Sequence, residues 1–164
     1  MQTLETIFAR RSIRAYQGTP IPAQDLQQIL EAGRQAPSAA NRQPWHFVVV
    51  TEPAQRKALA DACNGQMWMA DAGCIVVALG SPQISPKWYK VDVAIALEHI
   101  VLAAHSLGYG TCWIGAFDPA VAREVLGIPD NVTLIAFTPL GYTTVQATAK
   151  RRKPLAELVS YEHW

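Results

Sequence analysis

The pattern of apolar and polar residues divides the chain into helical and extended segments. Apolar residues recur at helical spacing in residues 3–9, 24–36, 53–63, 91–107 and 119–126, which predicts five helices. Residues 66–70 are expected to form one further short turn of helix. Short apolar runs between turn residues predict buried strands at 47–50, 74–79, 111–114 and 132–137. The longest periodic segment, 91–107, is rich in alanine, so another helix can approach it closely and we expect it in the core or at an interface between subunits.

One connection carries more polar chemistry than a turn requires. Pro37 ends the helix of residues 24–36, and a strand begins near Phe47. Between them, Ser38, Asn41 and Gln43 supply hydrogen-bond donors and acceptors on one loop. The sequence leaves two interpretations open, an ordinary helix-to-strand connection or a loop that binds a polar ligand.

Basic residues gather in two clusters that lie far apart in the sequence. Residues 10–14 hold three arginines and a serine, and residues 150–153 are all cationic. Arginine suits phosphate because its planar guanidinium binds two oxygens at once. The clusters can converge on one anion, remain separate solvated patches, or form a weak nucleic-acid footprint.

Composition narrows the classes of protein. With 164 residues, 50% of them hydrophobic and 16% charged, the chain is expected to fold as one globular domain. The formal net charge of +1 gives no global attraction to nucleic acid or membrane. Three cysteines without paired spacing argue against a disulfide framework, and no apolar stretch is long enough for a membrane span, so a cytoplasmic location is expected.

Familiar catalytic and metal-binding patterns are absent from the sequence. It contains no GxGxxG motif and no P-loop, the usual signatures of Rossmann and Walker phosphate sites. His99 and His105 lie six residues apart with no third clustered ligand, so no metal site is expected. Cys74 and Cys112 stand in apolar runs and are expected to be buried hydrophobes rather than nucleophiles.

Four stretches, taken in order, resemble the signature motifs of one family. They read RRSIR at 10–14, APSAANRQPW at 36–45, GTCWIGAF at 110–117 and KRRKP at 150–154. Together they resemble the nitroreductase superfamily of FMN-dependent oxidoreductases. The resemblance implies an α+β fold with a mostly antiparallel central sheet flanked by helices, and an intertwined homodimer with FMN at the interface. It makes residues 1–164 a single FMN-binding domain, with 150–164 as a C-terminal arm that crosses to the partner.

The resemblance also assigns positions to the cofactor. Arg10 and Ser12, joined by Lys150 and Arg152, would hold the FMN phosphate, and Arg14 would lie at the pyrimidine side of the ring. The partner subunit would supply the loop residues, and a third motif would pack on the ring with a backbone N–H near the flavin N5. The remaining expected cofactor contacts are Arg11, Pro37, Ser38, Ala39, Asn41, Gln43, Trp113, Ile114 and Gly115.

The implied activity needs no catalytic side chain, because the flavin carries the redox chemistry. The family suggests ping-pong electron transfer from NADH or NADPH through FMN to a nitroaromatic or quinone. The short segment 81–90 predicts an open pocket lined by Trp68, Trp88 and Tyr89. Two alternatives remain at this point: an FMN-binding carrier or sensor without reductase activity, and a small nucleic-acid-binding module using the two basic clusters.

Overall fold

A four-stranded antiparallel sheet forms the centre of the computed structural model, which describes residues 2–164. The strand order is β1-β2-β4-β3, and every pairing is antiparallel. The strands are β1 (Trp45–Val50), β2 (Cys74–Gly80), β3 (Gly110–Thr111) and β4 (Thr133–Gly141). The expected α+β fold with an antiparallel sheet is confirmed.

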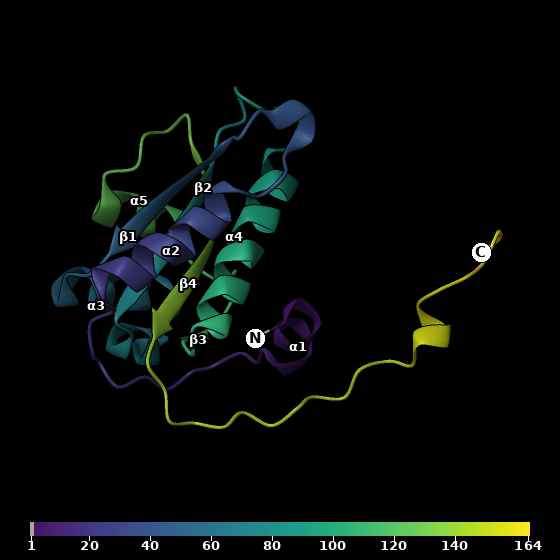
Figure 1. Cartoon of the computed structure of the whole chain (residues 1–164). Helices are drawn as coiled ribbons and strands as arrows, with labels where there is room; N and C mark the ends of the chain where they lie inside the picture. The colour runs from purple at the N-terminus through teal and green to yellow at the C-terminus, as the bar shows by residue number, and fades with distance from the viewer. Residues whose placement is uncertain (1) are drawn as a thin grey trace.

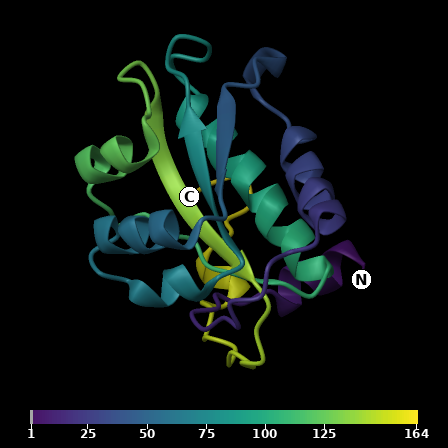
Figure 2. The ribbon, with the colours of Figure 1, turned by 90° about the vertical axis from the view of Figure 1, so that its left-hand side faces the viewer.

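Helices cover both faces of this sheet (Figures 1 and 2). In Figure 2 the sheet is seen between α3 and α5 on one side and α2 and α4 on the other. The helices are α1 (Thr3–Ala9), α2 (Ala23–Arg34), α3 (Pro53–Ala62), α4 (Tyr89–Ser106) and α5 (Pro119–Leu126), with short 3-10 turns η1 (Ala39–Asn41), η2 (Met67–Asp71) and η3 (Leu155–Glu157).

The hydrophobic core therefore has two layers, which β2 shares. Ile75, Val77 and Leu79 pack in one layer with α3 and α5, and alternate residues such as Val76 and Ala78 pack in the other with α2 and α4. Every residue of β2 is buried. Burial on both faces explains why this strand is a continuous apolar run rather than an alternating one.

The long helix α4 is the element that the rest of its layer packs around. At Gly33 of α2, a Cβ atom would lie only 2.6 Å from the Ile100 side chain of α4, so glycine permits the close approach of the two helices. Ile100 and Leu97 are fully buried in this contact. This packing holds α4 in place, so its first turn and its last turn are fixed positions that different loops contact.

The ends of the last two strands differ from the sequence expectation. The expected strand at 132–137 continues to Gly141 through Pro139, which lies in register with Ile75 of β2 and accepts a hydrogen bond from the Tyr16 hydroxyl at 3.4 Å. The expected strand at 111–114 shortens to Gly110–Thr111, followed by a single bridge from Ile114 to Phe137. Both differences arise because strand length depends on the neighbouring strand and not on local sequence alone.

The C-terminal segment leaves the body of the molecule. Residues 150–164 extend away from the sheet and helices in Figure 1. Leu155, Leu158, Tyr161 and Trp164 are all strongly exposed along it. These apolar side chains are therefore largely unpacked in the part of the chain that the structure describes. Within residues 2–164, no helix combines the length and the apolar character that a membrane span requires.

Candidate functional site

The two basic clusters converge in space. They surround one cavity of about 380 Å³, and a second hollow of about 280 Å³ beside α1 shares Arg10, Arg11, Lys150 and Arg152. Of the three interpretations open from the sequence, the structure therefore favours convergence over separate patches. The residues around the first cavity, here called the basic cavity, are Arg10, Arg11, Ser12, Arg14, Val145, Gln146, Ala147, Thr148, Lys150 and Arg152.

The N-terminal cluster is held against the edge of the sheet. Ser12 forms a parallel bridge with Thr111 of β3, and the Ile13 N–H donates to the Thr111 carbonyl at 2.8 Å. At Gly110 a Cβ atom would lie 2.9 Å from the Ile13 side chain, so only glycine allows this close approach. The backbone of residues 10–14 is thus fixed while their longer side chains reach into the cavity.

The basic cavity carries an excess of positive charge. Arg10 Nε lies 4.0 Å from Glu98 Oε1, and Arg11 Nη1 donates to the carbonyls of Phe8 and Arg10. Among residues 2–164, no carboxylate lies within 4.0 Å of a side-chain nitrogen of Arg11, Arg14, Lys150 or Arg152. Such a donor set suits a doubly charged anion such as a phosphate monoester.

The third motif, residues 110–117, lies at the same edge of the sheet. Trp113 Nε1 donates to Glu98 Oε2 at 2.7 Å, so Glu98 touches both this ring and Arg10. Ile114 is buried and paired with Phe137. A Cβ atom at Gly115 would have no other atom within 4 Å. Among residues 2–164, no hydrogen bond uses the Gly115 N–H. This backbone donor is available to a ligand.

The loop of residues 37–43 lies at the other end of α4. Its Ala39 N–H donates to Asp92 Oδ1 at 3.0 Å in the first turn of that helix. The basic cavity instead lies near the last turn, where the positive charges of Arg10 and Arg11 lower the pKa of His105. Asp92 and His105 are separated by about 20 Å at the rise of an α-helix. One chain therefore does not bring Pro37, Ser38, Ala39, Asn41 and Gln43 to the basic cavity.

The backbone of the 37–43 loop is unusual. Ala40, Asn41 and Gln43 have φ angles of 52°, 56° and 50°, in the left-handed region that favours glycine. Such a conformation costs about 1–2 kcal/mol for each ordinary residue. The Gln43 N–H donates to Ser38 Oγ at 2.9 Å and closes the loop on itself. The strain persists only because contacts impose it, as is common where a loop serves a site.

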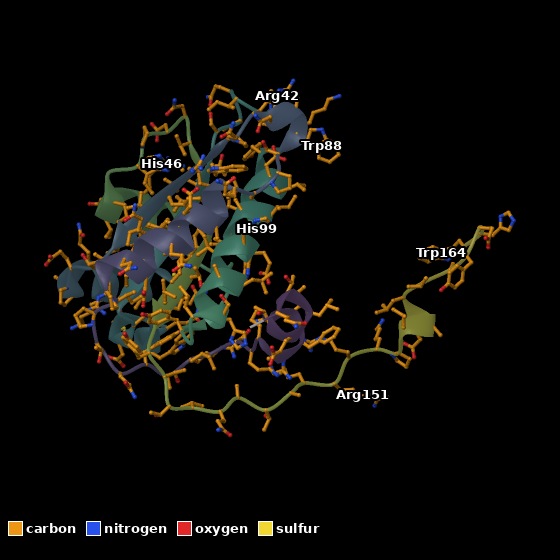
Figure 3. The ribbon with its side chains drawn as sticks, viewed as in Figure 1. Arg42, His46, Trp88, His99, Arg151 and Trp164 are labelled. Carbon is orange, nitrogen blue, oxygen red and sulfur yellow. The ribbon has the colours of Figure 1, made fainter. Side chains whose placement is uncertain are left out.

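The three aromatic residues expected around an open pocket do not meet within one chain. Trp68 belongs to η2, which precedes the start of β2, whereas Tyr89 packs beside Gly80 at the other end of that strand. Figure 3 shows Trp88 at the same end of the molecule as Arg42. In a single chain, Trp68 stacks instead on Tyr16, with ring centroids 6.3 Å apart.

Sequence reasoning missed two polar residues of α4, Asp92 and Glu98, and considered a third, His105, only as a metal ligand. Asp92 holds the 37–43 loop, Glu98 holds Trp113 and Arg10, and His105 lines a cavity of about 320 Å³ behind Arg11. All three are titratable side chains in a helix that is otherwise largely apolar. That contrast was the available signal for Asp92, which is buried, because a buried charged residue needs specific partners.

The cysteines are buried, as expected for Cys74 and Cys112. Burial raises the pKa of Cys63 to about 11 and that of Cys74 to about 12. It also raises the pKa of Cys112, although Arg14 opposes the shift. The thiols therefore stay protonated and lack the reactivity of a thiolate. Among residues 2–164, no group of three His, Cys, Asp or Glu side chains could hold a metal ion.

We expect His105 to make the stability of the fold depend on pH. Burial lowers its pKa from the ordinary value of 6.5, and Arg10 and Arg11 lower it further. The unfolded chain then binds more protons, so the stabilisation present above about pH 6.5 is lost as the pH falls through the lower, folded-state pKa. We expect the free energy of unfolding to fall between pH 7.5 and pH 5 and the fall to be smaller in His105→Gln. Urea unfolding across this range measures it, and identical pH profiles would contradict the assignment.

Comparisons with known proteins bear on this geometry. The family model of the Nitroreductase family matches residues 7–79 and 64–142. A protein of Archaeoglobus fulgidus, named as a candidate NADH dehydrogenase/NAD(P)H nitroreductase, is 36% identical over 148 residues, which are 86% of this chain and 85% of that protein.

Two solved structures share the fold over nearly the whole chain. A candidate NADH dehydrogenase/NAD(P)H nitroreductase from Parabacteroides distasonis has a TM-score of 0.93 and 27% identity, covering 100% of this chain and 99% of that one. The NADPH:FMN oxidoreductase of Vibrio harveyi, solved in complex with NAD+, has a TM-score of 0.91 and 29% identity, covering 99% and 77%.

Proposed function

This chain belongs to the nitroreductase family, and on that premise we propose that it passes electrons from NADH or NADPH through FMN to an oxidised small molecule. The enzyme class and the cofactor follow from relatives named NAD(P)H nitroreductase, NADPH-flavin oxidoreductase and FMN reductase. The observation that carries the proposal is the convergence of the two basic clusters on one cavity.

The donor set of that cavity fits the phosphate of FMN. Arg10, Ser12, Lys150 and Arg152 would hold the phosphate oxygens, with Arg11 contributing the donors that the carbonyls of Phe8 and Arg10 leave free. FMN phosphate carries nearly two negative charges, so several cationic donors are appropriate. Glu98 offsets only part of the positive charge, since it approaches Arg10 alone.

The other end of the cofactor would lie over the third motif. Arg14 would place its positive charge at the pyrimidine side of the ring, where negative charge develops on reduction. Trp113 and Ile114 would support the ring, and the free N–H of Gly115 would donate to its central nitrogen. When bound, FMN supplies the redox chemistry, accepting a hydride from NAD(P)H in one half-reaction and delivering two electrons to a nitroaromatic or quinone in the next. No side chain of this enzyme need act as an acid or base.

The site would be completed by a second copy of the chain. Because α4 separates the 37–43 loop from the basic cavity, Pro37, Ser38, Ala39, Asn41 and Gln43 could meet that cavity only across a dimer in which the two α4 helices run in opposite directions. The extended segment 150–164 supports the same arrangement, since its apolar side chains find no surface on their own chain. We therefore propose a homodimer of single-domain subunits whose C-terminal arms cross.

Anaerobic titration of the purified protein tests the function. We expect a yellow protein whose flavin absorbance bleaches on addition of NADH or NADPH and returns when a quinone or nitroaromatic is added. Initial rates with both substrates varied should give the parallel double-reciprocal lines of a ping-pong mechanism. A yellow protein that neither nucleotide reduces would instead be a flavin carrier or sensor. A colourless protein that cannot be reconstituted with FMN would contradict the proposal.

A further inference from the structure

A buried carboxylate at the start of α4 joins the 37–43 loop to residues 81–88. Asp92 is only 3% exposed. Its Oδ1 accepts from the Ala39 N–H at 3.0 Å, and its Oδ2 accepts from the hydroxyl of the fully buried Ser85 at 3.1 Å. Both oxygens are thus committed, one to the 37–43 loop, which is distant in sequence, and one to the preceding segment of residues 81–88. Its place in the first helical turn adds a favourable interaction with the helix dipole.

The 37–43 loop is clamped at both of its ends by these neighbours. Near its start the clamp is Asp92, and just past its end the Ser81 N–H donates to the Pro44 carbonyl at 2.9 Å. The backbone carbonyl of Ser85 also accepts a hydrogen bond from the Tyr89 N–H at 2.9 Å, where α4 begins. The 81–88 segment is therefore itself anchored. Figure 3 shows Arg42 and Trp88, which mark the two segments, at this same end of the molecule.

The clamp explains how ordinary residues hold a left-handed backbone. Ala40 and Gln43 have no intrinsic preference for positive φ, so a free loop would relax to other conformations. Fixing the Ala39 N–H to a buried carboxylate sets the direction in which the turn starts. The orientation of Ser38 and Asn41 therefore depends on Asp92, which itself is buried and does not face the cavity.

We propose that Asp92 is a positioning residue that holds the 37–43 loop in the shape required by the flavin site of the partner subunit. The inference rests on the proposed function, because it takes the loop to serve a cofactor bound in the other chain. Asp92 would affect the binding of FMN in the partner's cavity, whereas Arg10 would affect the binding of FMN in the cavity of its own chain. This division between chains gives the inference a test that a merely structural role would not pass.

Asp92→Ala removes both acceptors and leaves the loop free to leave its strained shape. If only about a tenth of the loops then remain competent, the dissociation constant for FMN rises about tenfold. Asp92→Asn is the matched conservative variant. Its amide can accept from the Ala39 N–H and donate to Ser85 Oγ, so FMN binding should stay within about twofold of the wild type.

Mixed dimers decide between the positioning role and a general loss of folding. Dimers of one Asp92→Ala chain and one Arg10→Ala chain, isolated with two affinity tags, contain one site with an intact cavity and an intact partner loop. We expect this heterodimer to bind one FMN with wild-type affinity, although both parent homodimers bind weakly. A heterodimer without any tight site, or an Asp92→Ala homodimer that binds FMN normally, would overturn the inference.

A second variant covers the case in which Asp92→Ala does not fold. Ala39→Pro removes the N–H that donates a hydrogen bond to Asp92 and leaves the hydrogen bond between Ser85 and Asp92 in place. The preceding residue Ser38 has φ −142° and ψ 159°, an extended conformation that suits a residue before proline. This variant should weaken FMN binding and should complement Arg10→Ala in the same way. Wild-type protein that binds no FMN would overturn the proposed function itself, whereas lost binding without complementation overturns only the role of Asp92.

Discussion

Replacing Arg10 or Arg152 with alanine is expected to weaken FMN binding by about 1.5–3 kcal/mol, the usual scale of a hydrogen bond to a charged group. In terms of the dissociation constant this is roughly a 10- to 150-fold increase. Both side chains line the basic cavity, one from the end of α1 and one from the extended C-terminal segment. Fluorescence titration of the FMN-free variants at fixed salt concentration measures the change.

Arg151→Ala is the matched control for this experiment. It removes the same charge from the same cluster, but Arg151 does not line the cavity, and Figure 3 shows its side chain directed away from the body of the molecule. FMN binding should remain within about twofold of the wild type, since screened surface charges contribute little. If Arg152→Ala retained FMN as well as Arg151→Ala does, the C-terminal cluster would have no part in the phosphate site.

Phe137→Ala is expected to lower the free energy of unfolding by about 3–5 kcal/mol, the range for removing a fully buried phenylalanine. Phe137 has no exposed surface, and its ring packs edge-to-face on Phe117 with centroids 4.7 Å apart. For a chain of this length the melting temperature should fall by about 6–20 °C. Urea and thermal unfolding at one protein concentration measure both quantities.

Val121→Ala serves as the control for the core variant. Val121 lies on α5, which covers the same face of the sheet, but its side chain is 42% exposed. Its loss should change stability by no more than about 0.5 kcal/mol. Equal losses for the two variants would mean that the packing around Phe137 is far looser than its burial indicates.

Local periodicity predicted the helices and most strands, because each of these elements buries a regular set of apolar residues. The helix α4 is one example, whereas β2 was predicted from a continuous apolar run instead of a periodic one. The ends of β3 and β4 could not be predicted in this way. Whether Pro139 lies inside a strand depends on its partner Ile75 and on Tyr16, which are distant in sequence.

The two basic clusters could be recognised in the sequence, but their arrangement in space could not. The convergence of residues 10–14 with Lys150 and Arg152 was one of several possibilities, and only the folded chain selects it. The separation of the 37–43 loop from that cavity follows from the length of α4, which no local motif contains. Asp92 escaped notice because its role depends on Ala39, which lies 53 residues before it in the sequence and meets it only in the folded chain.

The length of α4 also has a thermodynamic consequence. In the proposed dimer, a cofactor that needs the cavity of one chain and the loop of the other would bind the associated pair and not the separated subunits. By mass action, FMN would then strengthen subunit association, and diluting the protein would release the cofactor. The apparent affinity for FMN would rise with protein concentration, so the cell's supply of this polypeptide would itself regulate how much of it carries flavin.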